Sequence, residues 1–223
     1  MAIEFKQKTA LIIPAYNEVD RIQTVIKAAQ HAQLIDEIIV ACDGCTDGTY
    51  ELVSKDQTIQ CLNLQPNRGK GGAMLAGAQA TDAEIVLFMD ADLIGLDGKK
   101  IDSMVKPMLE DRAEMVLGVF KSGRGATDLA QVLVPYITGQ RAIKRSVFLS
   151  IPDLESARMG VETAITKYVS SCGYRVEKVD LHGCTHCMKE EKLGFAKGFS
   201  SRLKMYYEII KILADRKSYR VKK

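Results

Sequence analysis

The sequence predicts an α/β fold: a single domain in which a mostly parallel β-sheet is flanked by helices. Short apolar runs of strand length alternate with helical patterns through the first half of the chain. This alternation is typical of β-α-β units that build a parallel sheet. With 223 residues and an apolar content of 47%, the chain suits one domain with a sizeable core.

The first half is expected to contain strands separated by helices. The strands are apolar runs at residues 9–14, 37–41, 58–64, 84–89 and 115–120. The helices are expected at residues 22–29, 50–55, 73–80 and 99–110. In the first helix Ile22, Val25, Ile26 and Ala29 fall at helical spacing, and Thr46 is a candidate N-cap for the second.

The second half is less regular. Residues 121–127 carry two glycines and no periodicity, so we expect a loop there, either a substrate lid or a plain connector. Helices are expected near 139–149 and 161–171, and a strand at 175–181. A last amphipathic helix, 195–214, either docks on the core or rests on an anionic membrane surface. Contact with a membrane is suggested by the ten Lys and Arg residues that follow Glu191, where only two acids occur.

Composition and cysteine spacing restrict the compartment. No apolar stretch approaches the roughly 18 residues that span a bilayer, and residues 1–8 do not resemble a signal peptide, so we expect a cytoplasmic protein, with peripheral contact to the inner membrane face left open. The pairs Cys42/Cys45 and Cys184/Cys187 lie too far apart for a compact zinc module. We therefore expect reduced thiols.

Asp90 and Asp92 follow the apolar run at 85–89 directly, so two carboxylates stand where a buried strand ends. Side chains alternate along a strand, so the side chains of these two residues point the same way. Their mutual repulsion would cost about 4 kcal/mol at an effective dielectric near 20. A divalent cation between them and an anionic substrate would remove that cost, whereas a solvated turn is the simpler alternative.

Polar clusters follow each of the first four expected strands, at 16–18, 43–49, 67–72 and 90–92. Ligands of open parallel sheets bind outside the carboxyl ends of the strands. Glycines in two of these clusters allow a close backbone approach, and Arg68 and Lys70 supply positive charge for phosphate. Neither the Gly-x-Gly-x-x-Gly nor the P-loop fingerprint is present, so a nucleotide site would be of another kind.

Four segments in order resemble the motifs of the family 2 glycosyltransferases, which have the GT-A fold. They are residues 13–18 (Ile-Pro-Ala-Tyr-Asn-Glu), 43–49 (Asp-Gly-Cys-Thr-Asp-Gly-Thr), 67–73 (Asn-Arg-Gly-Lys-Gly-Gly-Ala) and 90–92 (Asp-Ala-Asp). The chain departs from the family pattern at Cys42, where Asp is usual, and at Cys45, where Ser is usual.

The resemblance implies a donor site for a nucleotide-diphosphate sugar, with UDP favoured. The residues that it places around the donor are Pro14, Ala15, Tyr16, Glu18, Asp43, Asn67, Lys70, Asp90 and Ala91. Within this set Asp43 lines the base pocket, Lys70 lies near the ribose or phosphates, and Asp90 holds the ribose. Asp92 binds Mg²⁺ or Mn²⁺ on the diphosphate, and His186 is the expected second metal ligand.

The acceptor side resembles polyprenyl-phosphate sugar transferases and glucosyl-3-phosphoglycerate synthases through residues 138–142 (Thr-Gly-Gln-Arg-Ala). That resemblance implies that Arg141 binds an anionic acceptor or the diphosphate. Glu162 would accept the proton of the acceptor hydroxyl, although the usual Glu-Asp reads Glu162-Thr163 here. Its alternative is an acid stabilised by a helix dipole.

These observations favour a glycosyltransferase that moves a sugar to an acceptor hydroxyl or phosphate, the acceptor being phosphate-bearing or lipid-linked. Residues 1–120 would form the donor half, 121–190 the acceptor half and 191–223 the basic C-terminal helix and tail. The alternatives are a nucleotidyltransferase on a related fold and a non-catalytic protein whose basic tail binds membrane or nucleic acid. We expect no nucleic acid partner, and a homo-oligomer is left open.

Overall fold

The structure is a computed structural model that describes residues 7–120, 138–155 and 160–186. The loop expected at 121–127 and the helix expected at 195–214 lie outside these residues. Within the described ranges, no helix is both long and apolar enough to cross a bilayer.

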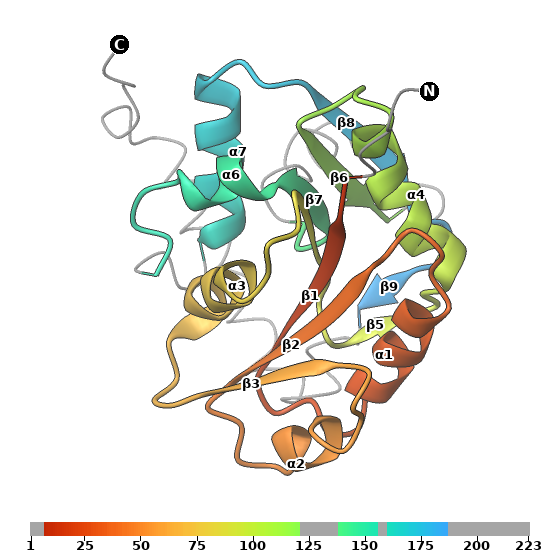
Figure 1. The fold of residues 1–223 in the computed structure, drawn as a ribbon, viewed down its shortest axis with the longest axis vertical. Coiled ribbons are helices and arrows are strands. Elements are labelled where there is room, and N and C mark those ends of the chain that lie inside the picture. Colours follow the sequence, from red (N-terminus) through yellow and green to blue (C-terminus); the bar gives the residue numbers. More distant parts are fainter. Residues whose placement is uncertain (1–6, 121–137, 156–159, 187–223) are drawn as a thin grey trace, which may run out of the picture.

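A seven-stranded sheet forms the centre of the fold (Figure 1). Its strands, in spatial order, are β3 (Gln60–Leu64), β2 (Glu37–Asp43), β1 (Thr9–Ala15), β4 (Ile85–Phe88), β7 (Arg141–Lys144), β6 (Met115–Val119) and β8 (Val176–Asp180). All neighbouring pairs are parallel except those of β7, which is antiparallel to both β4 and β6. A two-stranded ribbon, β5 (Leu93–Ile94) with β9 (Thr185–His186), lies beside the sheet.

Helices cover both faces of the sheet, as Figure 1 shows. The helices are α1 (Ile22–Gln30), α2 (Thr49–Val53), α3 (Gly69–Gln79), α4 (Gly98–Leu109), α6 (Arg145–Leu149) and α7 (Val161–Ser171). The first core cluster packs α1, α2 and α4 on one face, and the second packs α3, α6 and α7 on the other. Strand β1 supplies both, because Leu11 and Ile13 point to the first cluster while Ala10 and Ile12 point to the second.

The helix expected at 139–149 was wrong for its first part. Residues Arg141–Lys144 form β7, and the helix begins only at Arg145. Ala142 and Ile143 are both fully buried and belong to opposite core clusters, which is the alternation of a strand rather than a helix stripe. The short apolar run alone fits either structure, and pairing with strands on both sides decided it.

The N-cap assigned to Thr46 was also wrong. Helix α2 starts at Thr49, and its N-cap is Gly48 with a φ of +91°. The preceding Asp47 accepts a hydrogen bond from the Thr49 amide at 2.9 Å. The amide of Thr46 instead donates to Asn17 Oδ1 at 2.8 Å, which ties the loop after β2 to the loop after β1.

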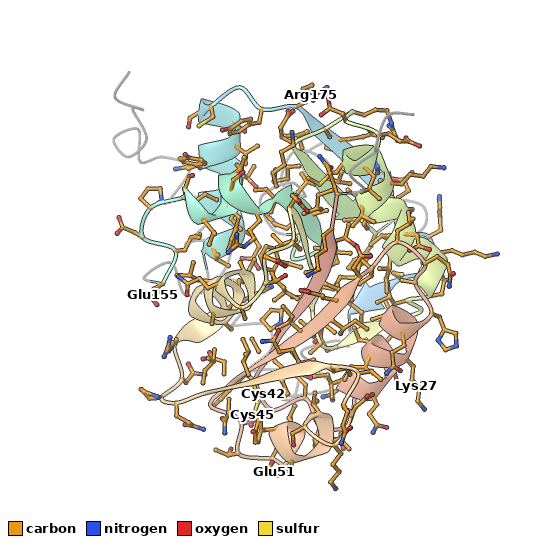
Figure 2. The ribbon with its side chains drawn as sticks, in the orientation of Figure 1. Lys27, Cys42, Cys45, Glu51, Glu155 and Arg175 are labelled. Carbon is orange, nitrogen blue, oxygen red and sulfur yellow. The ribbon has the colours of Figure 1, made fainter. Side chains whose placement is uncertain are left out.

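An ion-paired carboxylate at the β8 edge of the sheet makes stability depend on pH. Glu114 accepts hydrogen bonds from the guanidinium and the amide of Arg175, which Figure 2 shows at this edge. The Arg175 guanidinium outweighs the effect of burial and lowers the pKa of Glu114 to about 2, below the ordinary 4.5. A lowered folded-state pKa stabilises the fold above about pH 4.5, and this contribution disappears as the pH falls towards 2.

We therefore expect Glu114→Gln to lower the free energy of unfolding at pH 7 by about 1 kcal/mol, since the half-exposed partner is screened by solvent. Near pH 2 the variant and the original chain should be equally stable. Urea unfolding at both pH values measures this, with the exposed Glu51 on α2, also labelled in Figure 2, replaced by Gln as the control. An equal loss at both pH values would contradict the ion-pair explanation.

Candidate active site

The polar clusters predicted at the strand ends come together at one edge of the sheet. Strands β1, β2 and β4 run parallel, so their carboxyl ends meet at this edge. The N-termini of α3 and α7 lie at the same edge. Lys70, near the start of α3, is in direct contact with Glu162, near the start of α7. The sheet therefore assembles side chains from four separate segments.

Lys70 joins two acids that are far apart in the sequence. Its Nζ lies 2.6 Å from Asp90 Oδ1 and 2.6 Å from Glu162 Oε1. Burial by itself lowers the pKa of Lys70, but the charges of Asp90 and Glu162 outweigh it and raise the pKa above its ordinary value. Lys70 is therefore a cation fixed between the carboxylates of Asp90 and Glu162, which the sequence assigned to the donor and acceptor halves.

Asp90 is held from a second side by the segment that enters β7. Gln140 Nε2 donates to Asp90 Oδ2 at 2.8 Å. A Cβ on Gly139 would come within 2.5 Å of Asp90 Oδ2 and 2.8 Å of Lys70 Nζ, so any larger residue would displace this pair. Neither residue was among the predicted site residues, and the only sequence signal was their place in the motif at 138–142.

Asp43 ties the glycine-rich segment to the end of β2. Its side chain is buried, and Oδ1 accepts a hydrogen bond from the Arg68 amide at 2.7 Å. Its carbonyl accepts one from Asn67 Nδ2 at 2.6 Å. These bonds hold the start of α3, and with it Lys70, next to the loop that follows β2.

The segment after β1 forms the neighbouring wall. Ala15 is buried and Pro14 half-buried, whereas Tyr16 is 55% exposed. The amide of Glu18 donates to Thr49 Oγ1 at 3.0 Å, and the Glu18 carboxylate lies 3.4 Å from the Arg21 guanidinium. An exposed aromatic ring beside a fixed loop is suited to stacking on a planar group.

Asp92 lies between β4 and the β5–β9 ribbon. It is half-buried and follows the buried Ala91. The residue after it, Leu93, pairs with His186 across the ribbon, so the main chain of His186 runs beside Asp92. The described side chains contain no group of three or more His, Cys, Asp and Glu that could hold a metal.

Arg141 lies inside the protein rather than in an open site. Its guanidinium is fully buried and donates to the carbonyl of Thr138 and, at 3.0 Å, to the carbonyl of Glu162. Burial lowers the pKa of Arg141 to about 10, partly offset by the charges of Glu162 and Asp90, so the group stays cationic at neutral pH. In this structure Arg141 fixes the backbone that carries Glu162, and its expected contact with an acceptor or diphosphate stays a prediction.

Replacing Arg141 by Met is expected to lower the free energy of unfolding by about 2 kcal/mol, because two carbonyls would each lose one donor in the core. Chemical denaturation measures the loss. The control is Arg145→Met, which removes one bond to the Ala78 carbonyl at a half-buried position and should cost less. An unfolding midpoint for Arg141→Met equal to that of the original chain would contradict a supporting role.

The cysteines of the described residues are free thiols. Cys42 and Cys61 lie side by side on β2 and β3 with their sulfur atoms 4.0 Å apart. The hydrogen bond to Cys61, followed by burial, raises the pKa of the Cys42 thiol. Cys45 (Figure 2) donates to the Ala15 carbonyl at 3.4 Å, and Cys187 of the second pair lies outside the described residues.

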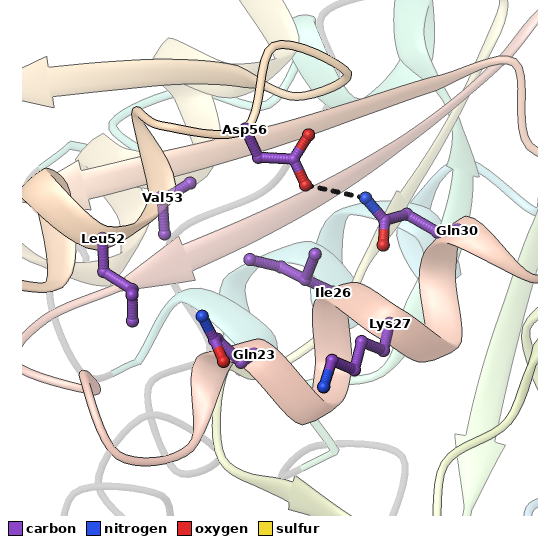
Figure 3. Close-up of a pocket in the computed structure, with 7 residues that line it drawn as sticks. All are labelled: Gln23, Ile26, Lys27, Gln30, Leu52, Val53 and Asp56. Atoms are coloured by element: carbon purple, nitrogen blue, oxygen red, sulfur yellow. Dashed lines mark hydrogen bonds between the residues drawn. The ribbon is translucent and has the colours of Figure 1, made fainter.

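A small pocket lies between α1 and α2 (Figure 3). Its lining residues are Gln23, Ile26, Lys27, Gln30, Leu52, Val53 and Asp56. Gln30 and Asp56 are hydrogen-bonded to each other across it at 2.8 Å, so part of its polar lining is already paired. None of the predicted site residues lines it.

Comparisons with known proteins agree on one family. Residues 10–168 match the family described as glycosyl transferase family 2. A dolichyl-phosphate beta-glucosyltransferase of Trichomonas vaginalis is 36% identical over 97 residues, which cover 38% of this chain and 29% of that protein. Glucosyl-3-phosphoglycerate synthase of Mycobacterium tuberculosis is 33% identical over 110 residues, which cover 45% of this chain. The chain spans about a third of the length of these curated relatives.

Solved structures extend the likeness to nearly the whole fold. The crystal structure of the Mycobacterium tuberculosis synthase in complex with Mn²⁺, UDP-glucose and phosphoglyceric acid superposes with a TM-score of 0.74 and 25% identity, covering 94% of this chain and 79% of that one. This likeness confirms the predicted GT-A fold, a mostly parallel sheet flanked by helices. With a match over residues 10–168, the chain belongs to glycosyl transferase family 2.

Proposed function

We propose that this chain transfers a sugar from a nucleoside-diphosphate sugar, with UDP as the favoured nucleotide, to an acceptor that carries a phosphate. The observation that carries the proposal is the position of Lys70, which contacts Asp90 on the donor side and Glu162 on the acceptor side at 2.6 Å each. In this proposal the sugar passes from donor to acceptor close to Lys70, which lies between the two acids.

The donor would lie along the carboxyl ends of β1, β2 and β4. Tyr16 offers an exposed ring for the base, and Asp43 fixes the wall behind it. Asp90, oriented by two partners, is suited to accept hydrogen bonds from the ribose hydroxyls. Lys70 would shift from the two acids towards the diphosphate, because a diphosphate brings more negative charge than either carboxylate.

The residues near Asp92 fit a hard divalent cation such as Mg²⁺ or Mn²⁺. Asp92 and His186 would hold it together with diphosphate oxygens, since Mg²⁺ is commonly bound by one or two carboxylates and substrate phosphates. When bound, the cation supplies charge stabilisation for the departing nucleotide. The Mycobacterium tuberculosis synthase, crystallised with Mn²⁺ or Mg²⁺ and UDP, supports this assignment.

Glu162 would face the acceptor. Its side chain is largely buried, and its backbone is fixed by Arg141. When Lys70 moves to the donor, Glu162 would become available to accept a proton from an acceptor hydroxyl. A phosphate acceptor needs no such proton transfer, and Glu162 would then only orient the neighbouring groups.

A phosphate-bearing acceptor is supported by the relatives, one named for dolichyl phosphate and the other for 3-phosphoglycerate. Residues 1–120 would supply the donor half and residues 121–190 the acceptor half, of which the structure describes 138–155 and 160–186. The predicted membrane contact of the basic C-terminal segment falls outside the described residues and stays a prediction.

The test is a calorimetric titration of the chain with UDP, GDP and their glucose conjugates, with and without Mn²⁺. We expect UDP to bind more tightly than GDP, and only when Mn²⁺ is present. Turnover is then measured with 3-phosphoglycerate and with a short polyprenyl phosphate as acceptors. Absence of metal-dependent nucleotide binding in every titration would overturn the proposal.

A further inference from the structure

Gln140 is a fully buried glutamine whose side chain faces the carboxylate of Asp90. Its Nε2 donates to Asp90 Oδ2 at 2.8 Å, and its Oε1 lies 3.0 Å from Thr138 Oγ1. A carboxylate can only accept, so the amide nitrogen must be the atom that faces Asp90. The orientation of the carboxamide is therefore determined by the Asp90 carboxylate.

The backbone around Gln140 is equally constrained. Its carbonyl accepts a hydrogen bond from the Gly118 amide of β6 at 2.9 Å, and Thr138 Oγ1 lies 2.6 Å from the Gly118 carbonyl. Gly139 is packed so closely on the Asp90–Lys70 pair that a Cβ would clash with both. The segment 138–140 can therefore leave Asp90 only if its bonds to β6 break.

Lys70 and Gln140, which both bond to Asp90, differ in how they would respond to a donor. Lys70 is charged, 30% exposed and already shared with Glu162, so a diphosphate competes for it directly. Gln140 is neutral and fully buried, and a phosphate gains little by approaching it. When Lys70 is withdrawn, the hydrogen bond from Gln140 still holds Asp90 Oδ2.

We propose that Gln140 is a positioning residue, which keeps the Asp90 carboxylate in its donor-binding orientation after Lys70 has turned to the diphosphate. This inference rests on the proposed function, because it assigns Gln140 to the donor site of that reaction. Gln140 acts through Asp90 and touches no substrate. Replacing Gln140 should therefore raise the Kd for the donor nucleotide in a chain that still folds.

The experiment compares UDP binding in the presence of Mn²⁺ for the original chain, Gln140→Met and Gln140→Glu. Met keeps a similar length but cannot donate, and we expect the Kd for UDP to rise about tenfold, the effect of one lost hydrogen bond to a charged group. Glu places a second carboxylate against Asp90, so at pH 8 we expect its Kd to exceed that of the Met variant by about another tenfold. A buried Glu also destabilises the fold more than Met does, so urea unfolding is measured for each variant and the Kd values are compared under conditions in which all three chains are folded.

The control is Thr9→Val, which removes a buried hydroxyl that bonds the Leu34 carbonyl and Asp36 at the opposite end of β1. It should lose a similar amount of stability and bind UDP as the original chain does. A Kd within twofold of the original chain for both Gln140 variants would overturn the inference while leaving the proposed function intact. If the original chain binds no nucleotide at all, the proposed function is overturned and this inference with it.

Discussion

Asp92→Ala is expected to lower kcat/KM about 1,000-fold and to abolish the dependence of UDP binding on Mn²⁺. The carboxylate comes shortly after β4 and next to the ribbon that carries His186, and we propose that it holds a cation against the diphosphate. Stabilisation of the leaving group by a cation contributes several kcal/mol to the transition state, which corresponds to this loss in rate. Calorimetry with and without Mn²⁺, together with steady-state kinetics, measures both effects.

The matched control is Asp56→Ala, which removes another loop carboxylate with hydrogen-bonded partners, in the α1–α2 pocket away from the site. It should leave the response to Mn²⁺ unchanged. If Asp92→Ala binds UDP with the same metal dependence as the original chain, the cation is held by another carboxylate, and the assignment of Asp92 is wrong.

Lys70→Met should lower kcat/KM about 100-fold, with most of the loss in the Kd for UDP. The change removes the cation that joins Asp90 to Glu162, and the two carboxylates then face each other and the diphosphate without a positive charge between them. A charge-assisted bond to phosphate contributes about 1.5–3 kcal/mol. Repulsion between the two carboxylates and the diphosphate adds to the loss when the lysine is removed. Titration with UDP and kinetics over a range of donor concentrations separate binding from turnover.

Lys8 provides a control of the same chemistry. It also bridges two acids, Glu37 at 2.5 Å and Asp82 at 2.7 Å, but at the amino end of the sheet. Lys8→Met should leave UDP binding as it is. The role given to Lys70 would not stand if both lysine variants bound UDP equally well.

The order of strands and helices could be predicted from the sequence because most elements have a simple apolar pattern. Strand β4 is an uninterrupted apolar run with both faces buried, and α1 carries one apolar stripe. Strand β7 could not be predicted, since a run of four residues before a short helix has no distinct period of its own. Its identity depends on β4 and β6, which hydrogen-bond to it from both sides.

The site was predictable to the extent that its residues follow strand ends. Asp43, Asp90 and Asp92 could be placed at one edge of the sheet because parallel strands bring their carboxyl ends together. The role expected for Arg141 depended on exposure, which motif position does not reveal. The structure buries its guanidinium against two carbonyls.

By itself the sequence determined the α/β class, the family motifs and the set of polar residues at the strand ends, because these depend on local pattern and chain order. Only the tertiary structure decided which of them touch. Lys70 meets Glu162, and Gln140 meets Asp90, because β7 is inserted antiparallel beside β4 and brings the later segments against the carboxyl end of that strand. Such contacts depend on the pairing of distant strands and on the burial that follows from it, and neither is a property of the local sequence.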